Sequence, residues 1–176
     1  MTEKKIPVKT IIKDRKGDTT EGLFLIMRKE NIIPILEGKK TIEFRDNTMF
    51  YMSRFCESKT VQAVKTGKRI ANFELKDIHY IRFSNYNQTW FADVAVEAVD
   101  YMALLPQNRD YFHERNCFVV DDIINDAEKK GLTAKDEETT WVFCLPIKAL
   151  INTDLTDVKI NIPIKNISDA KYKPLN

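Results

Sequence analysis

Short apolar or alternating stretches recur along this chain, and they limit the folds open to it more than any other feature. Alternation places every second side chain on one face of a strand, so such stretches predict half-buried strands. The predicted strands span residues 21–27, 40–45, 70–75, 78–83, 91–99, 139–145 and 158–165. The last one contains Pro163, which has no N–H donor and is therefore expected at a sheet edge.

Only two stretches have helical spacing. The first predicts a short helix that starts near Asn31, because Pro34 is tolerated in a first turn, and that ends at Gly38. The second spans residues 119–130, with acids in its first turn, two lysines in its last and Gly131 after it. Many short strands with two helices predict an α+β fold around a small mixed, mostly antiparallel sheet or barrel.

The length of 176 residues predicts one domain with one core. We expect a basic N-terminal arm over residues 1–20, a domain over 21–148 and a C-terminal extension with an edge strand over 149–176. No apolar run approaches the roughly 20 residues of a membrane helix, and the N-terminus lacks the apolar core of a signal peptide. Three cysteines without a CxxC pair favour reduced thiols, so a cytoplasmic location is expected.

The charge balance argues against one class of partner. With 28 Lys and Arg against 26 Asp and Glu, a broad duplex-binding surface is not expected. Basic residues gather in residues 1–20 and 59–69, and acidic ones in 121–138, which predicts either two charged faces or solvated loops and helices. A single-nucleotide cleft needs only a few cations and a carboxylate, so the balance favours a short or single-stranded ligand.

Metal and cofactor motifs are weak or absent. The chain has no GxGxxG, GxxxxGK[ST], HExxH or GxSxG motif. His113 and Cys117 have i, i+4 spacing, but Cys56 and His79 would have to join them from separate places, and ordinary buried thiols are the more common outcome. We therefore predict no metal and no cofactor.

Residues 38–45 (GKKTIEFR) place a lysine, a carboxylate and a guanidinium together where a helix leads into a strand. Alternation predicts Ile42 and Phe44 on one strand face, and on the other Thr41, Glu43 and Arg45. Such a group can bind a polar planar ligand, since the carboxylate accepts N–H bonds from a base edge while the cations contact phosphate or carbonyl oxygen. It can also do acid–base chemistry, or be a surface ion-pair ladder.

The order of apolar strand, short helix, glycine and GxKxxExR resembles the ASCH domain, the activating-signal-cointegrator homology family of the PUA-like superfamily. The motif falls on Gly38, Lys40, Glu43 and Arg45, and the resemblance covers roughly residues 22–147. It implies a small PUA-like β-barrel with flanking helices and a cleft for RNA or a modified nucleoside. The residues expected to bind the ligand are Gly38, Lys40, Thr41, Glu43, Arg45 and Arg54.

Some small members of this family are amidohydrolases that act on N4-acetylcytidine, and a ribonuclease activity is attributed to others. The amidohydrolases use a lysine, a threonine and a glutamate. Lys40 matches the lysine, Glu43 occupies the position of the threonine, and Glu114 lies in a place comparable to the glutamate. This departure favours binding over catalysis, and leaves an amidohydrolase with Lys40, Glu43 and Glu114 as the alternative.

Two further features have open interpretations. Aromatic residues around Arg82 are expected either to stack on unpaired bases or to complete the core; they are Tyr80, Phe83, Tyr86, Trp90 and Phe91. The basic arm and the edge strand near Pro163 allow a third function, a protein-interaction module.

Overall fold

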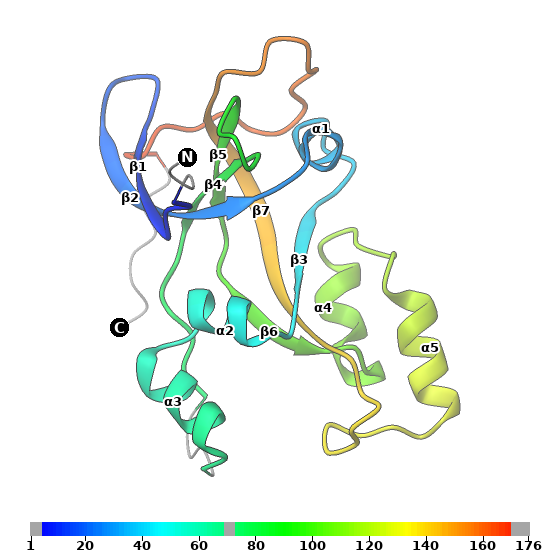
Figure 1. Ribbon diagram of the computed structural model, residues 1–176. Helices are drawn as coiled ribbons and strands as arrows, with labels where there is room; N and C mark the ends of the chain where they lie inside the picture. The colour runs from blue at the N-terminus through cyan, green and yellow to red at the C-terminus, as the bar shows by residue number, and fades with distance from the viewer. Residues whose placement is uncertain (1–4, 69–72, 170–176) are drawn as a thin grey trace. The chain divides into compact units, whose positions relative to one another are not determined.

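The computed structural model describes residues 5–68 and 73–169 (Figure 1). Within these ranges the chain forms two compact units built from interleaved segments. Unit 1 contains the chain up to Lys40, Asp77–Ala98 and the chain from Ile147, and unit 2 contains Thr41–Lys76 and Val99–Pro146. The sequence predicted one core, whereas each unit has a core of its own, because the apolar segments return to two separate sets of strands.

Unit 1 is a five-stranded sheet with one helix, α1 (Lys29–Leu36). Its strands follow the order β1-β2-β4-β5-β7, and every pair is antiparallel except the parallel pair β2–β4. They are β1 (Lys9–Lys13), β2 (Thr19–Ile26), β4 (Tyr80–Ser84), β5 (Phe91–Val96) and the second half of β7 (Trp141–Thr153).

The region predicted as a basic arm contains β1, the first strand of this sheet. A tight turn makes the hairpin with β2: Asp14 Oδ1 accepts the N–H groups of Lys16 and Asp18, each at 2.9 Å. Gly17 has φ +98°, a value that favours glycine. The turn residues were present in the sequence, but only Ile12 of β1 is buried, so the strand has a weak apolar signal.

The C-terminal extension returns from β7 to β1 (Figure 1). The Leu150 N–H donates to the Pro163 carbonyl at 2.8 Å, and the Ile167 N–H donates to Asp14 Oδ2 at 2.9 Å. The strand predicted over 158–165 is reduced to one bridge between Leu150 and Ile164, because the Asn161 N–H bonds to α1 instead and Pro163 has no N–H. Among the described residues no ladder joins β1 to β7, so the sheet is open.

The helix α1 begins two residues before the predicted start, which puts Pro34 in its second turn. A proline there removes one intrahelical bond, but the Pro34 carbonyl accepts the N–H groups of Lys39 and Lys40, which tie down the end of the helix. Gly38 has φ +78°, as its predicted role at the end of the helix requires. The Asn161 carbonyl oxygen lies 2.8 Å from where a Cβ would stand, so the extension also requires a glycine at this position.

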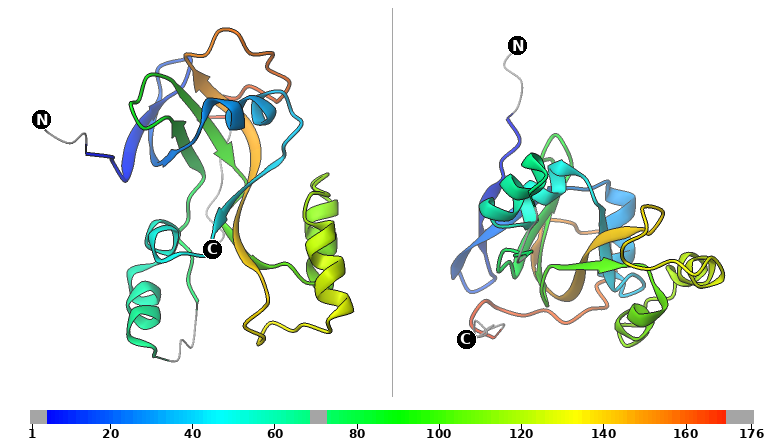
Figure 2. Two further views of the ribbon diagram at one scale, coloured as in Figure 1. Left: turned by 45° about the vertical axis from the view of Figure 1, so that its right-hand side comes forward. Right: turned by 90° about the horizontal axis from the view of Figure 1, so that it is seen from below.

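Unit 2 is a three-stranded antiparallel sheet in the order β3-β7-β6, with helices on both sides (Figures 1 and 2). Its strands are β3 (Ile42–Asp46), the first half of β7 and β6 (Asp100–Ala103). Its helices are α2 (Met49–Phe55), α3 (Ser58–Thr66), the 3-10 turn η1 (Pro106–Asn108), α4 (Arg109–His113) and α5 (Asp121–Lys129).

The predicted α+β class is confirmed: the described residues form seven strands, mostly antiparallel, and five short helices. The predicted helix over 119–130 is confirmed as α5, but α2, α3 and α4 were not predicted. The strand expected over 91–99 is β5, which ends at Val96, and β6 begins after it at Asp100. The first half of the strand expected over 70–75 lies outside the described residues, and in the second half only Leu75 forms a bridge, with Cys56. None of the described helices is long and apolar enough to cross a membrane.

The predicted alternation of β3 places its apolar side chains in the core of unit 2. Ile42 and Phe44 pack with Phe112 of α4, and the Phe44 and Phe112 rings lie 6.2 Å apart. Cys117 and Cys144 belong to the same core. Because successive side chains of a strand point to opposite faces, Glu43 and Arg45 lie on the other face.

Candidate functional site

The motif residues Glu43 and Arg45 form an ion pair on one face of β3. An Arg45 guanidinium nitrogen lies 3.3 Å from Glu43 Oε2, and the two side chains are only 11% and 7% exposed. Glu43 Oε1 accepts the N–H of Phe44 at 2.9 Å. Burying an ion pair removes both charges from water, so the arrangement is costly unless further polar contacts support it.

Tyr51 of α2 supplies such a contact. Arg45 donates a hydrogen bond to the Tyr51 hydroxyl at 2.9 Å, and its guanidinium lies 5.4 Å from the centre of the Tyr51 ring. The Tyr51 ring stacks on Phe55, which packs in turn against Phe143 of β7. The β3–α2 site, defined as Glu43, Arg45 and Tyr51, therefore joins two charges to an aromatic wall.

Thr41 is not part of this site, although the sequence predicted it on the same face as Glu43 and Arg45. Its hydroxyl donates to the Arg115 carbonyl oxygen at 2.6 Å, just after α4. The strand begins only at Ile42, so the alternation that the prediction used does not extend to Thr41. Thr41 therefore anchors the start of β3 to the α4 side of unit 2.

The sequence predicted Arg54 as a ligand-binding residue, but Tyr51, three residues before it, is the residue that contacts Arg45 of the motif. The Arg54 guanidinium lies 4.3 Å from the centre of the Phe50 ring and donates to the Ser53 hydroxyl at 3.2 Å. On a helix, residues four apart share a face, so Phe50 pairs with Arg54 while Tyr51 pairs with Phe55. Recognising a helix over Met49–Phe55 would have separated these two faces.

Glu114 lies apart from Glu43. It follows α4, which packs on the Ile42 and Phe44 face of the sheet, whereas Glu43 is on the face that meets α2. The side chain of Glu114 is exposed. The structure therefore does not bring together the two glutamates that the amidohydrolase alternative would use.

Gly38 and Lys40 belong to unit 1, and the boundary between the units falls directly after Lys40. Gly38 serves the end of α1 and the approach of Asn161, as described above. The Lys40 N–H donates to the Pro34 carbonyl at 3.1 Å, and the residue is half-buried. The roles of both residues toward a ligand stay predictions from the motif.

The described residues contain no group of three or more His, Cys, Asp and Glu side chains placed to hold a metal ion. His113 Nε2 lies 2.7 Å from Asp121 Oδ1, while Cys117 packs in the core. Burial raises the pKa of the Cys56 thiol to about 11 and raises that of Cys144 further, so both thiols are neutral at pH 7. These cysteines are core residues.

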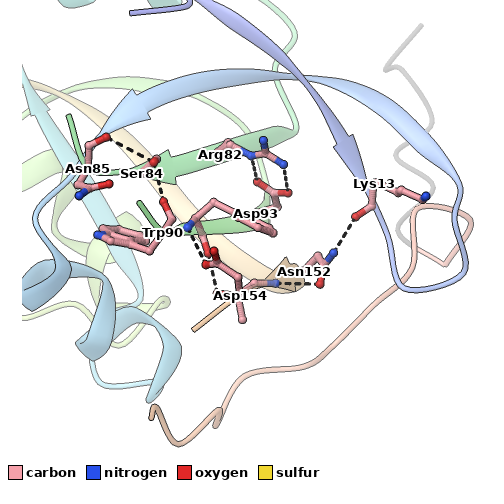
Figure 3. A network of polar contacts seen from close by, with 10 residues as sticks. Lys13, Arg82, Ser84, Asn85, Trp90, Asp93, Asn152 and Asp154 are labelled. Atoms are coloured by element: carbon pink, nitrogen blue, oxygen red, sulfur yellow. Dashed lines mark hydrogen bonds and ion pairs between the residues drawn. The ribbon is translucent and has the colours of Figure 1, made fainter. Parts of the chain in front are cut away.

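Unit 1 holds a second buried ion pair, shown in Figure 3. Arg82 Nε and Nη2 donate to the two oxygens of Asp93 at 2.8 and 2.9 Å, and Asp93 is fully buried. The hydrogen bond to Asp93 raises the pKa of Arg82, whereas burial raises that of Asp93 against the lowering effect of Arg82. The guanidinium also lies 4.6 Å from the centre of the Phe91 ring.

The aromatic cluster around Arg82 divides between core and surface. Phe83 and Trp90 are buried, and Ser84 donates its hydroxyl to the Trp90 carbonyl at 2.6 Å, which fixes the β4–β5 hairpin (Figure 3). Tyr86 is exposed. The core interpretation is therefore the correct one for Phe83 and Trp90.

A hollow of about 540 Å³ adjoins this hairpin in unit 1. Arg28 and Lys29 line it from the start of α1, and Asp154 and Asp157 line it from the segment after β7. Asp154 accepts the N–H of Phe91 at 2.9 Å. Charges of both signs surround the hollow, so it does not select one class of ligand.

Comparison with protein-family models, with curated proteins and with solved structures found no match for this chain.

Proposed function

We propose that this chain is an ASCH-like protein that binds RNA or a modified nucleoside at the β3–α2 site. Glu43 accepts N–H groups of the base, and Arg45 donates to a carbonyl or phosphate oxygen. The observation that carries the proposal is the buried Glu43–Arg45 pair, which lies on the motif strand beside the Tyr51 ring.

Three features of this pair support a role in binding. Its 3.3 Å contact is longer than an ordinary charge-assisted hydrogen bond, and the planar guanidinium can donate to a ligand oxygen in competition with this contact. The Glu43 carboxylate accepts hydrogen bonds from the Phe44 N–H and from Arg45, and oxygens of this kind also accept N–H groups of a base. The aromatic wall of Tyr51 and Phe55 offers the kind of surface on which bases stack.

The proposal includes the fold that the motif implies. In unit 1, Ile12 of β1 packs with Ala149 and Ile151 of β7, so the open sheet is strongly curled. The segment that carries Pro163 and Ile167 bonds to β7 and to the turn that follows β1. This curled sheet supports a PUA-like barrel whose seam is bridged by the C-terminal extension.

A binding assay with matched variants tests the function. Calorimetry with a panel of pyrimidine nucleosides, including N4-acetylcytidine, and anisotropy with labelled single-stranded RNA are compared for wild type, Lys40→Ala and Glu43→Gln. Each change has a neighbouring control: Lys39→Ala removes an exposed lysine that pairs with Glu37, and Asp46→Asn changes an exposed carboxylate on the same strand.

We expect the two motif variants to lose at least about tenfold in affinity, because a buried charged group left without its partner costs about 1.5–3 kcal/mol. The two control variants should bind as wild type does. Equal binding by wild type and by a Lys40→Ala/Glu43→Ala double variant would contradict the proposal. Release of cytidine from N4-acetylcytidine, followed by chromatography, would favour the amidohydrolase alternative.

The edge strand β1 supports a second proposal, a contact with a protein partner. Among the described strands β1 pairs with β2 alone, and Ile11 in its middle is 62% exposed. Deleting residues 1–20 would remove β1 from the sheet, so a point change is the better test. Ile11→Lys should abolish pull-down of a partner without changing nucleoside binding, and retained pull-down would argue against this contact.

A further inference from the structure

We propose that a hollow along α3 of unit 2 binds the phosphate backbone of a single-stranded RNA. This inference deepens the proposed function and rests on it, since it extends the ligand from one nucleoside to a strand. The hollow has a volume of about 510 Å³. It is lined by Ser58, Lys59, Gln62, Ala63, Thr66 and Lys68.

The lining has the chemistry of a phosphate-binding surface. Lys59 stands near the start of α3, and Lys68 follows the glycine at its end. Gln62 and Thr66 lie between them at helical spacing from Lys59 and add polar groups along the same side. No acidic residue lines this hollow; Glu57 and Glu74 line the adjoining hollow, which shares Ser58 and Lys59 with it.

These lysines have no ion-pair partner among the described residues. Elsewhere on the surface, Lys39 pairs with Glu37 at 2.7 Å and Lys130 pairs with Asp126 at 3.1 Å. Lys59 and Lys68 make no such contact within residues 5–68 and 73–169. Their charges are therefore available to an anionic ligand, which releases counterions when it binds.

The size of the hollow favours a single strand. Lys59 and Thr66 are seven residues apart on a helix, which corresponds to about 10 Å along its axis. Proteins that read duplex RNA by shape span about 16 base pairs, far more than this hollow offers. The chain also leads from the motif strand through α2 into α3 in few residues, since two residues separate α2 from α3. The proposed ligand is therefore a single-stranded RNA that places one base in the β3–α2 site and its phosphate backbone in the hollow.

The experiment compares affinity and its salt dependence for a single-stranded RNA of about 12 nucleotides, within the usual range of site sizes. Wild type, a Lys59→Ala/Lys68→Ala double variant and Lys65→Ala are titrated between about 50 and about 200 mM salt. Lys65 is an exposed lysine on the same helix that does not line the hollow, so it is the control for charge and for helix stability. Circular dichroism checks that each variant is folded.

Each single-strand phosphate contact contributes about 0.7 to the slope of log affinity against log salt, so the double variant should lose about 1.4. Over this fourfold rise in salt, wild type should therefore weaken about sevenfold more than the double variant. Lys65→Ala should have the wild-type slope. Nucleoside binding separates the two sites: the Lys59→Ala/Lys68→Ala double variant should keep it, and Glu43→Gln, added as a fourth protein, should lose it.

Other outcomes would overturn the inference. If nucleosides bind but the oligonucleotide binds no tighter than a nucleoside, the hollow is not a strand site while the proposed function stands. Equal salt slopes for the double variant and wild type would also show that the hollow does not bind an RNA strand. If heparin and duplex RNA compete as well as single-stranded RNA, the hollow is a general polyanion surface and not an RNA site. If wild type binds no nucleoside, the proposed function itself is contradicted.

Discussion

Two buried ion pairs in the described part of this protein, Arg82–Asp93 and Glu43–Arg45, differ in geometry, and the difference separates a structural pair from a candidate site. Arg82 and Asp93 face each other across β4 and β5 and share two hydrogen bonds of 2.8 and 2.9 Å. Glu43 and Arg45 lie two residues apart on one strand, and Arg45 Nη2 donates to Glu43 Oε2 at the longer distance of 3.3 Å. In the second pair, the arginine also bonds to Tyr51.

A bidentate pair uses the fork of the guanidinium fully, so its geometry is fixed and its charges satisfy each other. A pair held by a longer contact is weaker, so a ligand can compete for its groups at a smaller cost. The comparison teaches that burial alone does not identify a functional charge, since Asp93 is the more deeply buried carboxylate. The following predictions test this contrast, from the largest expected effect to the smallest.

Asp93→Ala should have the largest effect on stability. It leaves Arg82, whose side chain is only 24% exposed, without its partner, and the cost of such a broken buried pair is about 3 kcal/mol. Urea unfolding measures the loss. A double variant, Arg82→Met with Asp93→Leu, should recover most of it because no charge is then left unpaired. Failure of the double variant to recover would show that the pair itself, and not the orphaned charge, stabilises unit 1.

Glu43→Gln should cost less stability, about 1–2 kcal/mol, because its contact with Arg45 is the longer one and the amide oxygen can still accept the Phe44 N–H. Its effect on nucleoside affinity should be the larger of its two effects. Measuring unfolding and binding on the same protein gives both. A loss of stability as large as that of Asp93→Ala, with unchanged binding, would make Glu43–Arg45 a structural pair as well.

Tyr51→Phe should cost about 1 kcal/mol or less, because it removes one hydrogen bond to Arg45 and keeps the ring against Phe55. The freed guanidinium is then held only by Glu43 and its other contacts, so nucleoside affinity should fall although the stacking surface is intact. Tyr86→Phe, which removes the hydroxyl of an exposed tyrosine in unit 1, is the matched control. Equal nucleoside affinity for wild type and Tyr51→Phe would show that the Tyr51 hydroxyl has no role in binding.

Asp14→Asn should have the smallest effect at neutral pH and a clear effect on pH dependence. Burial raises the pKa of Asp14, but N–H bonds from Ile167, Asp18 and Lys16 outweigh it and lower the pKa below its ordinary value of 3.8. The ionised form therefore stabilises the folded state at pH above 3.8, and this contribution is lost as pH falls through the lower folded pKa.

The asparagine variant keeps the acceptor for Lys16 and Asp18 but turns an N–H donor toward Ile167. It should be less stable than wild type at pH 6, and the difference should shrink as acid protonates Asp14. Thermal unfolding at a series of pH values measures this. A difference that stays constant down to acidic pH would mean that the charge of Asp14 does not hold the extension.

Much of the fold could be predicted where the pattern was strong. The alternation of β3 correctly separated Ile42 and Phe44 from Glu43 and Arg45, and α5 had capping acids and a terminal glycine. The prediction missed α2 and α3, which are short and bury only two residues each. It also failed for the extension, whose Asn161 and Pro163 bond to α1 and β7 instead of forming a strand.

The candidate site shows the same division. The sequence predicted Glu43 and Arg45 together because two residues along a strand return to the same face, which is a local rule. It placed Thr41 with them wrongly, because the strand begins one residue later. It included Arg54 for its positive charge near Arg45, and it did not recognise the helix that brings Tyr51 to Arg45.

By itself, the sequence determined the class of the fold, the end of α1 at Gly38 and the pairing of Glu43 with Arg45, because each follows from backbone preferences over a few residues. Only the tertiary structure decided that the chain forms two units, that Tyr51 holds Arg45, and that the C-terminal extension ties β7 to the turn after β1. These features depend on residues far apart in the chain or on short helices stabilised by packing, and local pattern carries little information about either.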